Sequence, residues 1–295
     1  MRVLNIGSLN IDYVYSVDHI IQPGETEATG SRNIFLGGKG MNQSCALAKA
    51  GVEVYHGGMI GQDGTMFLDA CKEYGVHDEF IKIVDGHSGH TIIQIDKNAQ
   101  NSILLYGGAN QKLTTEYVDE VLSHFEADDI LLLQNEVNLL PYIVDKAYEK
   151  GMQIALNPSP FNEHLDAVDM KKISIFLLNE VEGFQLTGEK DPDAIIAKLR
   201  ELFPHARIML TLGQDGSVYA DAQQKVYQSA FKVMAVDTTA AGDTFTGYFL
   251  AGLAEGLPIE EILQMSAKAS SIAVTCHGAV PSIPYREEVL EALQD

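Results

Sequence analysis

One short segment combines small residues, a carboxylate and the start of a predicted helix. Residues 237–245 read Asp-Thr-Thr-Ala-Ala-Gly-Asp-Thr-Phe, and apolar residues over 244–257 follow at the spacing of a helix with one buried face. Asp243 is therefore expected in the first turn of that helix, where free amide groups and the helix dipole favour phosphate oxygens or a developing anion. A carboxylate there could remove the proton of an attacking hydroxyl during phosphoryl transfer. It could equally be a helix cap, for which Asp is favoured.

A glycine-rich segment precedes another predicted helix. Residues 36–42 read Leu-Gly-Gly-Lys-Gly-Met-Asn, so side chains are missing where a ligand or a neighbouring backbone could approach, while Lys39 and Asn42 supply polar groups. The segment matches neither the P-loop nor the G-x-G-x-x-G dinucleotide motif. An ordinary glycine turn is the alternative interpretation.

Polar residues also follow the first predicted strand. Asn10 and Asp12 alternate, so both side chains could face one side and, with Lys39 and Asn42, bind sugar hydroxyls. Turn residues that bond their own backbone would look the same.

Two further strand ends carry candidate ligand groups. Asn179 and Glu182 flank a strand-to-helix turn and suit Mg²⁺, which prefers few carboxylates together with water and phosphate oxygens. Acidic residues are also favoured in a first helical turn for dipole reasons alone. Thr211, Gly213 and Gly216 follow another strand and would allow a nucleotide to approach the backbone, although a simple hairpin turn has the same pattern.

The elements that must position these groups alternate along the chain. Short apolar runs predict strands at 3–7, 54–60, 130–134, 153–157, 175–178, 207–212 and 217–220, and helical periodicity predicts helices at 41–50, 66–74, 115–124, 142–150 and 192–203. This order predicts an α/β fold with a doubly wound, mostly parallel central sheet flanked by helices. Ligands then bind at the carboxyl ends of the strands.

Two segments interrupt this alternation. Residues 11–36 and 80–106 have strand patterning without helices between the strands, and residues 91–106 resemble a hairpin. We expect a small separate sheet that acts as a lid over the site, within a single domain spanning residues 1–295. Two ordinary hairpin insertions are the alternative. An apolar lid face could pair across a two-fold axis, which favours a homodimer.

Composition limits the possible partners and location. The formal net charge of −21 argues against nucleic acid as a partner, because phosphate binding needs a basic surface. No apolar run approaches the roughly 20 residues of a membrane helix, and the first residues lack the features of a signal peptide, so we expect no membrane partner and a cytoplasmic protein.

The order of these motifs along the chain resembles the ribokinase-like carbohydrate kinases, the family that includes the phosphofructokinase-B type. The shared pattern comprises Asn-x-Asp, Gly-Gly-Lys-Gly-x-Asn, Asn-Pro at 157–158, Asn-x-x-Glu, Thr-Leu-Gly-x-x-Gly and Ala-Gly-Asp-Thr-Phe, and it spans residues 7 to about 288. Ala240 stands where many members have Gly. The ribokinase branch often has Ala there, and that branch is the most similar.

The resemblance implies ATP-dependent transfer of the γ-phosphate to the primary hydroxyl of a pentose, with ribose as the expected acceptor. By this match Asp243 is the base, and the amides of Ala240, Ala241 and Gly242 form an anion hole. The expected sugar ligands are Asn10, Asp12, Gly38, Lys39, Asn42 and Glu136. The expected nucleotide ligands are Asn179, Thr211, Gly213, Gly216, Lys268 and His277, with Asn179 and Glu182 supporting Mg²⁺ through water.

The resemblance also implies a monovalent cation, such as K⁺, beside the anion hole. The matching positions are Asp237, Thr239, Val274, His277, Gly278 and Ser282. Two alternatives stay open. The acceptor could be deoxyribose, fructose, a keto-deoxy sugar acid or a nucleoside, or the chain could be a non-catalytic sugar or nucleotide sensor on the same fold. The intact Asp243 argues against a sensor.

Overall fold

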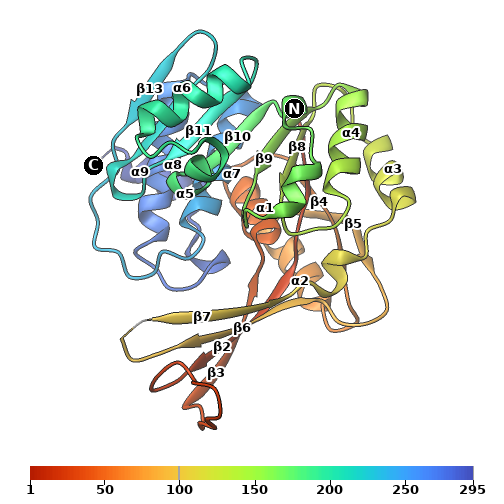
Figure 1. Cartoon of the computed structure of the whole chain (residues 1–295), viewed down its shortest axis with the longest axis vertical. Coiled ribbons are helices and arrows are strands. Elements are labelled where there is room, and N and C mark those ends of the chain that lie inside the picture. The colour runs from red at the N-terminus through yellow and green to blue at the C-terminus, as the bar shows by residue number, and fades with distance from the viewer. Residues whose placement is uncertain (99, 295) are drawn as a thin grey trace.

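The computed structural model describes residues 1–98 and 100–294, and a long mostly parallel sheet organises most of them (Figure 1). The strand order in this sheet is β13-β12-β11-β10-β9-β8-β1-β4-β5. Its strands are β1 (Val3–Ile6), β4 (Val54–Ile60), β5 (His77–Ile83), β8 (Ile130–Gln134), β9 (Gln153–Asn157), β10 (Ile175–Asn179), β11 (Arg207–Thr211), β12 (Ser217–Ala220) and β13 (Lys225–Gln228). In this order, every neighbouring pair from β11 through β10, β9, β8, β1 and β4 to β5 is parallel. Strands β12 and β13 form an antiparallel edge next to β11.

Helices cover both faces of this sheet, as a doubly wound fold requires. They are α1 (Lys39–Lys49), α2 (Thr65–Tyr74), α3 (Thr115–Ser123), α4 (Leu140–Lys150), α5 (Glu180–Thr187), α6 (Pro192–Leu202), α7 (Ala241–Glu255), α8 (Ile259–Ala273) and α9 (Arg286–Ala292). One apolar core lies under α1, α2, α7 and α8, and a second lies under α3, α4 and α6. Successive strand residues point to opposite faces, so Val3 joins the first core and Leu4 the second. The predicted fold class is confirmed.

The described helices include none that is both long and apolar enough to cross a lipid bilayer. The predicted helix boundaries agree with the structure to within a residue or two. For example, α1 begins at Lys39 rather than at residue 41, because the glycine-rich segment itself supplies the first turn.

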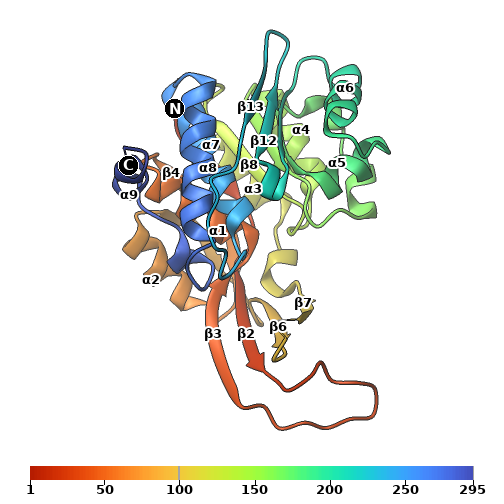
Figure 2. The same ribbon diagram turned by 90° about the vertical axis from the view of Figure 1, so that its left-hand side faces the viewer.

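The small second sheet projects away from the large one, and we call it the lid sheet (Figures 1 and 2). It consists of β2 (Asn10–Ser16), β3 (Ser31–Gly37), β6 (Gly89–Ile95) and β7 (Asn101–Tyr106), in the order β3-β2-β6-β7. Strands β2 and β6 are parallel, and the other two pairs are antiparallel. The predicted hairpin strands are therefore present, although residue 99, between them in the sequence, lies outside the described residues.

One predicted boundary is wrong. The segment 80–106 was expected to belong to the lid sheet, but residues up to Ile83 form β5, which pairs in parallel with β4 at the edge of the large sheet. No helix separates β5 from β6, so the sequence pattern marks no change of sheet there.

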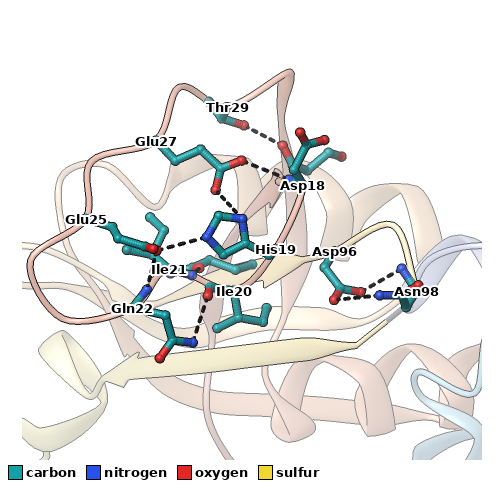
Figure 3. Close-up of polar contacts among 12 residues, drawn as sticks. Asp18, His19, Ile20, Ile21, Gln22, Glu25, Glu27, Thr29, Asp96 and Asn98 are labelled. Atoms are coloured by element: carbon teal, nitrogen blue, oxygen red, sulfur yellow. Dashed lines mark hydrogen bonds and ion pairs between the residues drawn. The ribbon is translucent and has the colours of Figure 1, made fainter.

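The long connection between β2 and β3, residues 17–30, lies at the far end of the lid sheet (Figure 2). Figure 3 shows that its own polar groups hold it together: the His19 ring lies 2.9 Å from Glu25 Oε2 and 3.7 Å from Glu27 Oε2. The hydrogen bond to Glu25 and the charges of Glu25 and Glu27 raise the pKa of His19. The loop is thus an exposed, internally bonded extension of the lid sheet.

Candidate active site

Asp243 lies in the first turn of α7, as predicted, but it is not the helix cap. Ala240 occupies the cap position in a left-handed conformation, with φ of 59°, and no side chain caps the helix. The Asp243 carboxylate is 6% exposed and turns toward α1 instead. Its Oδ2 accepts a hydrogen bond from Asn42 Nδ2 at 2.9 Å, and its Oδ1 accepts one from Gln43 Nε2 at 2.8 Å. The cap interpretation is therefore wrong.

Close packing of α1 against α7 produces this arrangement. A Cβ atom added to Gly247 would lie 2.3 Å from the Cβ of Ala46, so only glycine allows the two helices to approach so closely. The crossing sets Asn42 and Gln43, on the first turns of α1, directly against Asp243.

The amino end of α7 also leaves room for a ligand. A Cβ atom added to Gly242 would have no protein heavy atom within 4 Å, and its φ is not positive, so the protein's own packing does not require glycine there. Residues Ala240 to Asp243 line a cavity of about 230 Å³. Free amides at a helix start bind anions well, and this end of α7 is open to receive one.

The glycines of residues 37–40 are explained by tertiary contacts. A Cβ atom on Gly37 would lie 1.9 Å from Asp12 Oδ2, and one on Gly40 would lie 2.4 Å from the Ser8 amide nitrogen. Gly38, with φ of 89°, is the cap of α1. These residues therefore bring the start of α1 against the end of β1 and the start of β2, which an ordinary turn would not need.

Lys39 extends from the first turn of α1 into the cavity that Asp243 lines. The negative charge of Asp243 raises the pKa of Lys39, and Glu136 and Glu182 act in the same direction against the opposing effect of burial. Lys39 was predicted as a sugar ligand. The structure places its side chain beside the predicted base and anion hole.

The predicted sugar ligands meet between the lid sheet and the end of β8. Thr91 Oγ1 donates to Asp12 Oδ1 at 2.5 Å, and burial, with the nearby charge of Glu136, raises the pKa of Asp12 to about 6. Glu136 Oε2 accepts hydrogen bonds from Ser8 Oγ and, at 3.0 Å, from the Lys39 amide. Burial raises the pKa of Glu136, although the Ser8 hydrogen bond and the Lys39 charge oppose it.

Two buried amides complete this region. Asn10 Oδ1 accepts from Asn110 Nδ2 at 2.7 Å, and Asn110 Oδ1 in turn accepts from the Leu9 amide. Asn42 Oδ1 is buried and has no hydrogen-bond partner within the described residues. A buried carbonyl oxygen without a partner is costly, so this atom points to a ligand that donates a hydrogen bond.

The sequence-based prediction gave no role to Ser8, Gln43, Thr91 and Asn110. Ser8, Thr91 and Asn110 lie outside the motifs on which the prediction rests, and Gln43 directly follows one of them. The available signal for Gln43 was its place directly after Asn42 on a helix whose following residues are small or apolar.

Asn179 and Glu182 form a capping box at the start of α5. Asn179 Oδ1 accepts from the Glu182 amide at 2.9 Å, and Glu182 Oε2 accepts from the Asn179 amide at 3.0 Å. Glu182 is nevertheless buried and lines the same cavity as Asp243. Among the described residues no group of three or more His, Cys, Asp or Glu side chains could hold a metal alone. The donor set therefore fits Mg²⁺ only together with phosphate oxygens and water, which is how this ion commonly binds.

A second cavity, of about 520 Å³, adjoins the first, and the two share Thr211, Thr238, Ala241, Gly242 and Phe245. Its lining includes the predicted nucleotide residues Thr211, Gly213 and Gly216. Lys268 does not line it directly, but its Nζ lies 4.6 Å from the ring centre of Phe231, which does. His277 is exposed and is not part of this lining.

Four of the predicted cation ligands, Asp237, Thr239, Val274 and Gly278, are connected by hydrogen bonds beside the amino end of α7. Asp237 Oδ1 accepts from the Thr239 amide at 2.9 Å, and Asp237 Oδ2 accepts from the Gly278 amide at 3.0 Å. Partial burial opposes ionisation, but these hydrogen bonds outweigh it and hold the pKa of Asp237 below its usual value. The Val274 carbonyl accepts the amides of Val236 and Asp237. Ser282 Oγ donates to the Ala279 carbonyl, within its own turn.

The model of the pfkB family carbohydrate kinases matches residues 2–286, and the chain belongs to this family. It is 35% identical to the ribokinase of Haemophilus influenzae over 98% of the chain and 97% of that protein.

Solved structures give the same result. A Cryptococcus neoformans ribokinase in complex with ADP is 33% identical with a TM-score of 0.86, covering 99% of each chain. Arabidopsis thaliana ribokinase complexed with ribose and ATP is 28% identical with a TM-score of 0.87, covering 100% of this chain and 99% of that one. The predicted family and the ribokinase-like fold are confirmed.

Proposed function

We propose that the chain is an ATP-dependent ribokinase that transfers the γ-phosphate to the primary hydroxyl of D-ribose and produces ribose 5-phosphate. The observation that carries this proposal is the buried Asp243 carboxylate at the open amino end of α7. On one side lie sugar-type ligands from the lid sheet, and on the other lies a nucleotide-sized cavity. The similarity to ribokinases with ribose, ATP or ADP bound supports the same assignment.

In this mechanism Asp243 accepts the proton of the ribose hydroxyl as its oxygen attacks the γ-phosphorus in line, while the bond from the γ-phosphorus to the bridging oxygen breaks and ADP leaves. The amides of Ala241 and Gly242 and the ammonium of Lys39 stabilise the charge on the transferring group. Mg²⁺ fits beside Asn179 and Glu182, where it would neutralise phosphate charge when bound with ATP. Closure of the lid sheet would exclude water.

The sugar ligands suit a neutral polyol. Asp12, Glu136 and Asn42 supply oxygen acceptors, and Asn42 Oδ1 has no protein partner among the described residues. Sugar hydroxyls would donate to these acceptors. Lys39 lies on the phosphate side, which leaves the acceptor end of the site acidic and disfavours a sugar phosphate or sugar acid.

We further propose that K⁺ or another monovalent cation activates the enzyme from a site at Asp237. The ionised carboxylate and its hydrogen bonds to Thr239 and Gly278 connect the loop before α7 with the loop after α8. A cation there would stiffen the anion hole without joining the chemistry. Thr239, Val274, His277, Gly278 and Ser282 stay predictions as its other ligands.

Homodimerisation through the lid sheet also belongs to the proposal. Exposed apolar side chains gather on this sheet, among them Ile103, Leu104 and Leu105. Leu104→Asp is expected to convert a dimer to a monomer in sedimentation analysis. Leu202→Asp, a matched change on α6, should leave the dimer intact. A monomeric native protein would refute the dimer, and the cytoplasmic location stays a prediction.

The direct test is ADP release by the native enzyme with a panel of sugars, followed by identification of the product. We expect the highest kcat/KM for ribose and a phosphate on its primary hydroxyl. A higher value for deoxyribose, fructose, a keto-deoxy sugar acid or a nucleoside would change the acceptor. If no member of the panel supported ADP release, the sensor alternative would replace the kinase.

A further inference from the structure

A chain of buried amide side chains runs behind the predicted base. Gln43 is fully buried, and both hydrogens of its Nε2 are used: one is donated to Asp243 Oδ1 at 2.8 Å and the other to Asn157 Oδ1 at 3.2 Å. Gln43 Oε1 accepts from Gln134 Nε2 at 2.7 Å. Gln134 Nε2 also donates to Asn5 Oδ1 at 3.0 Å.

We propose that Gln43 is a positioning residue for phosphoryl transfer, which orients the Asp243 carboxylate and links it to the Glu182 side of the site through Asn157. This inference rests on the proposed role of Asp243 as the base.

The direction of every hydrogen bond in this chain is set from its ends. An ionised carboxylate only accepts, so Gln43 must present its NH₂ group to Asp243. At the other end, Asn5 Nδ2 donates to the Gly40 carbonyl at 2.8 Å, and a carbonyl also only accepts. Asn5 Oδ1 therefore faces Gln134, and Gln134 faces the oxygen of Gln43. The Gln43 amide therefore cannot flip without breaking its hydrogen bonds to Asp243 and Gln134.

The end of this hydrogen-bond network farthest from Asp243 carries no charge. Asn5 Nδ2 also donates to Ser44 Oγ at 2.9 Å, and Ser44 Oγ lies 2.8 Å from His56 Nδ1. Burial lowers the pKa of His56 to about 4, so its ring is uncharged at neutral pH and accepts from Ser44. The network thus delivers two fixed N–H groups to Asp243 and Asn157 without bringing a charge to them.

The branch through Asn157 reaches the predicted metal side. Asn157 Nδ2 donates to the Leu177 carbonyl at 2.9 Å and lies 3.5 Å from Glu182 Oε2. One amide group of Gln43 therefore holds both the base and the residue that contacts Glu182. Because a displacement of about 1 Å can slow a reaction about 100-fold, a rigid link between these groups matters for turnover.

Charged groups also surround Asp243, and a Gln43→Leu substitution leaves them unchanged. They are Lys39 on α1, Glu136 after β8 and Glu182 on α5. A change in the turnover of that variant therefore reports the lost amide.

The experiment compares native enzyme, Gln43→Leu and a matched control, Gln153→Leu. Gln153 begins β9, at the end of that strand opposite to Asn157. We expect Gln43→Leu to lower kcat about 10- to 100-fold with little change in the KM for ribose. Gln153→Leu should match the native enzyme.

A second variant guards against misfolding. Asn157→Leu keeps the amide donor to Asp243 but removes the link to Glu182, so we expect a higher KM for MgATP and a smaller loss of kcat than in Gln43→Leu. Native kcat in a folded Gln43→Leu variant, or a KM for ribose that rises as much as kcat falls, would overturn the inference. If the native enzyme phosphorylated no sugar, the proposed function itself would fail, which is a different result.

Discussion

Replacing Asp243 with asparagine keeps the shape of the proposed base but removes its ability to accept a proton. Asp243 accepts two N–H groups, from Asn42 at 2.9 Å and from Gln43 at 2.8 Å, and an asparagine can accept only one because its other arm is NH₂. Two donors would then face each other, which should lower the free energy of unfolding by about 1–3 kcal/mol. Loss of the general base should lower kcat by about 10²–10⁴-fold.

These two effects are separable because proteins typically have about 5–15 kcal/mol of stability and would stay folded after the smaller loss. Turnover would be measured by coupled ADP release at saturating ribose and ATP, and stability by thermal unfolding of the same preparation. Calorimetric titration should show ribose affinity close to native, because the sugar ligands are unchanged. Asp166→Asn, the same change at an exposed aspartate, is the control and should be native in all three.

Turnover of the folded Asp243→Asn variant within a few-fold of native would refute the assignment of Asp243 as the base. If the activity lost in the variant equalled its unfolded fraction, Asp243 would have only a structural role, in the hydrogen bonds that connect α7 to α1.

Three further outcomes follow from the site geometry. The pKa of Asp12 is raised to about 6, and sugar hydroxyls favour its ionised form, so ribose affinity should fall about fivefold as pH drops from 6 to 5. The Asp12→Asn variant should bind ribose more weakly, with an affinity that does not depend on pH. Calorimetry that found the same pH dependence of ribose affinity in the variant and the native enzyme would contradict this. Gly242→Ala places a methyl in open space, so the melting temperature should hold or rise while kcat falls about 100-fold; native kcat would show that no phosphate occupies that space. Asp237→Asn should raise the K⁺ concentration for half-maximal activation at least about tenfold, measured against tetramethylammonium, whereas an unchanged midpoint would place the cation elsewhere.

The large sheet could be predicted because its strands are buried on both faces and read as short apolar runs. The residues of β8 are Ile-Leu-Leu-Leu-Gln, all buried, and a helix follows at α4. The edge strand β5 begins with three polar residues, is only partly buried, and leads into the lid sheet without a helix. Its pattern is that of a lid strand, so only its pairing with β4 assigns it to the large sheet.

The site was only partly predictable. Its motifs are short sequence segments, but the contacts that require their residues come from distant parts of the chain. Nothing near Gly37 in the sequence shows that its missing side chain makes room for Asp12, 25 residues earlier. Gln43 and Asn110 are buried amides whose partners lie about 100 to 200 residues away. The motifs gave these two residues no role, so their roles emerge only when the fold supplies their partners.

The division of the site between two parts of the chain has a consequence for how variants should behave. Asp243 lies in α7, whereas Asp12 lies in the lid sheet, and the start of α1 lies close to both: Asn42 donates to Asp243, and Gly37, just before the helix, packs against Asp12. Changes in the lid sheet should therefore alter mainly KM for the sugar, and changes at the start of α7 should alter mainly kcat. Changes at the start of α1 should alter both, because this helix would fix the distance between the attacking hydroxyl and the proposed base.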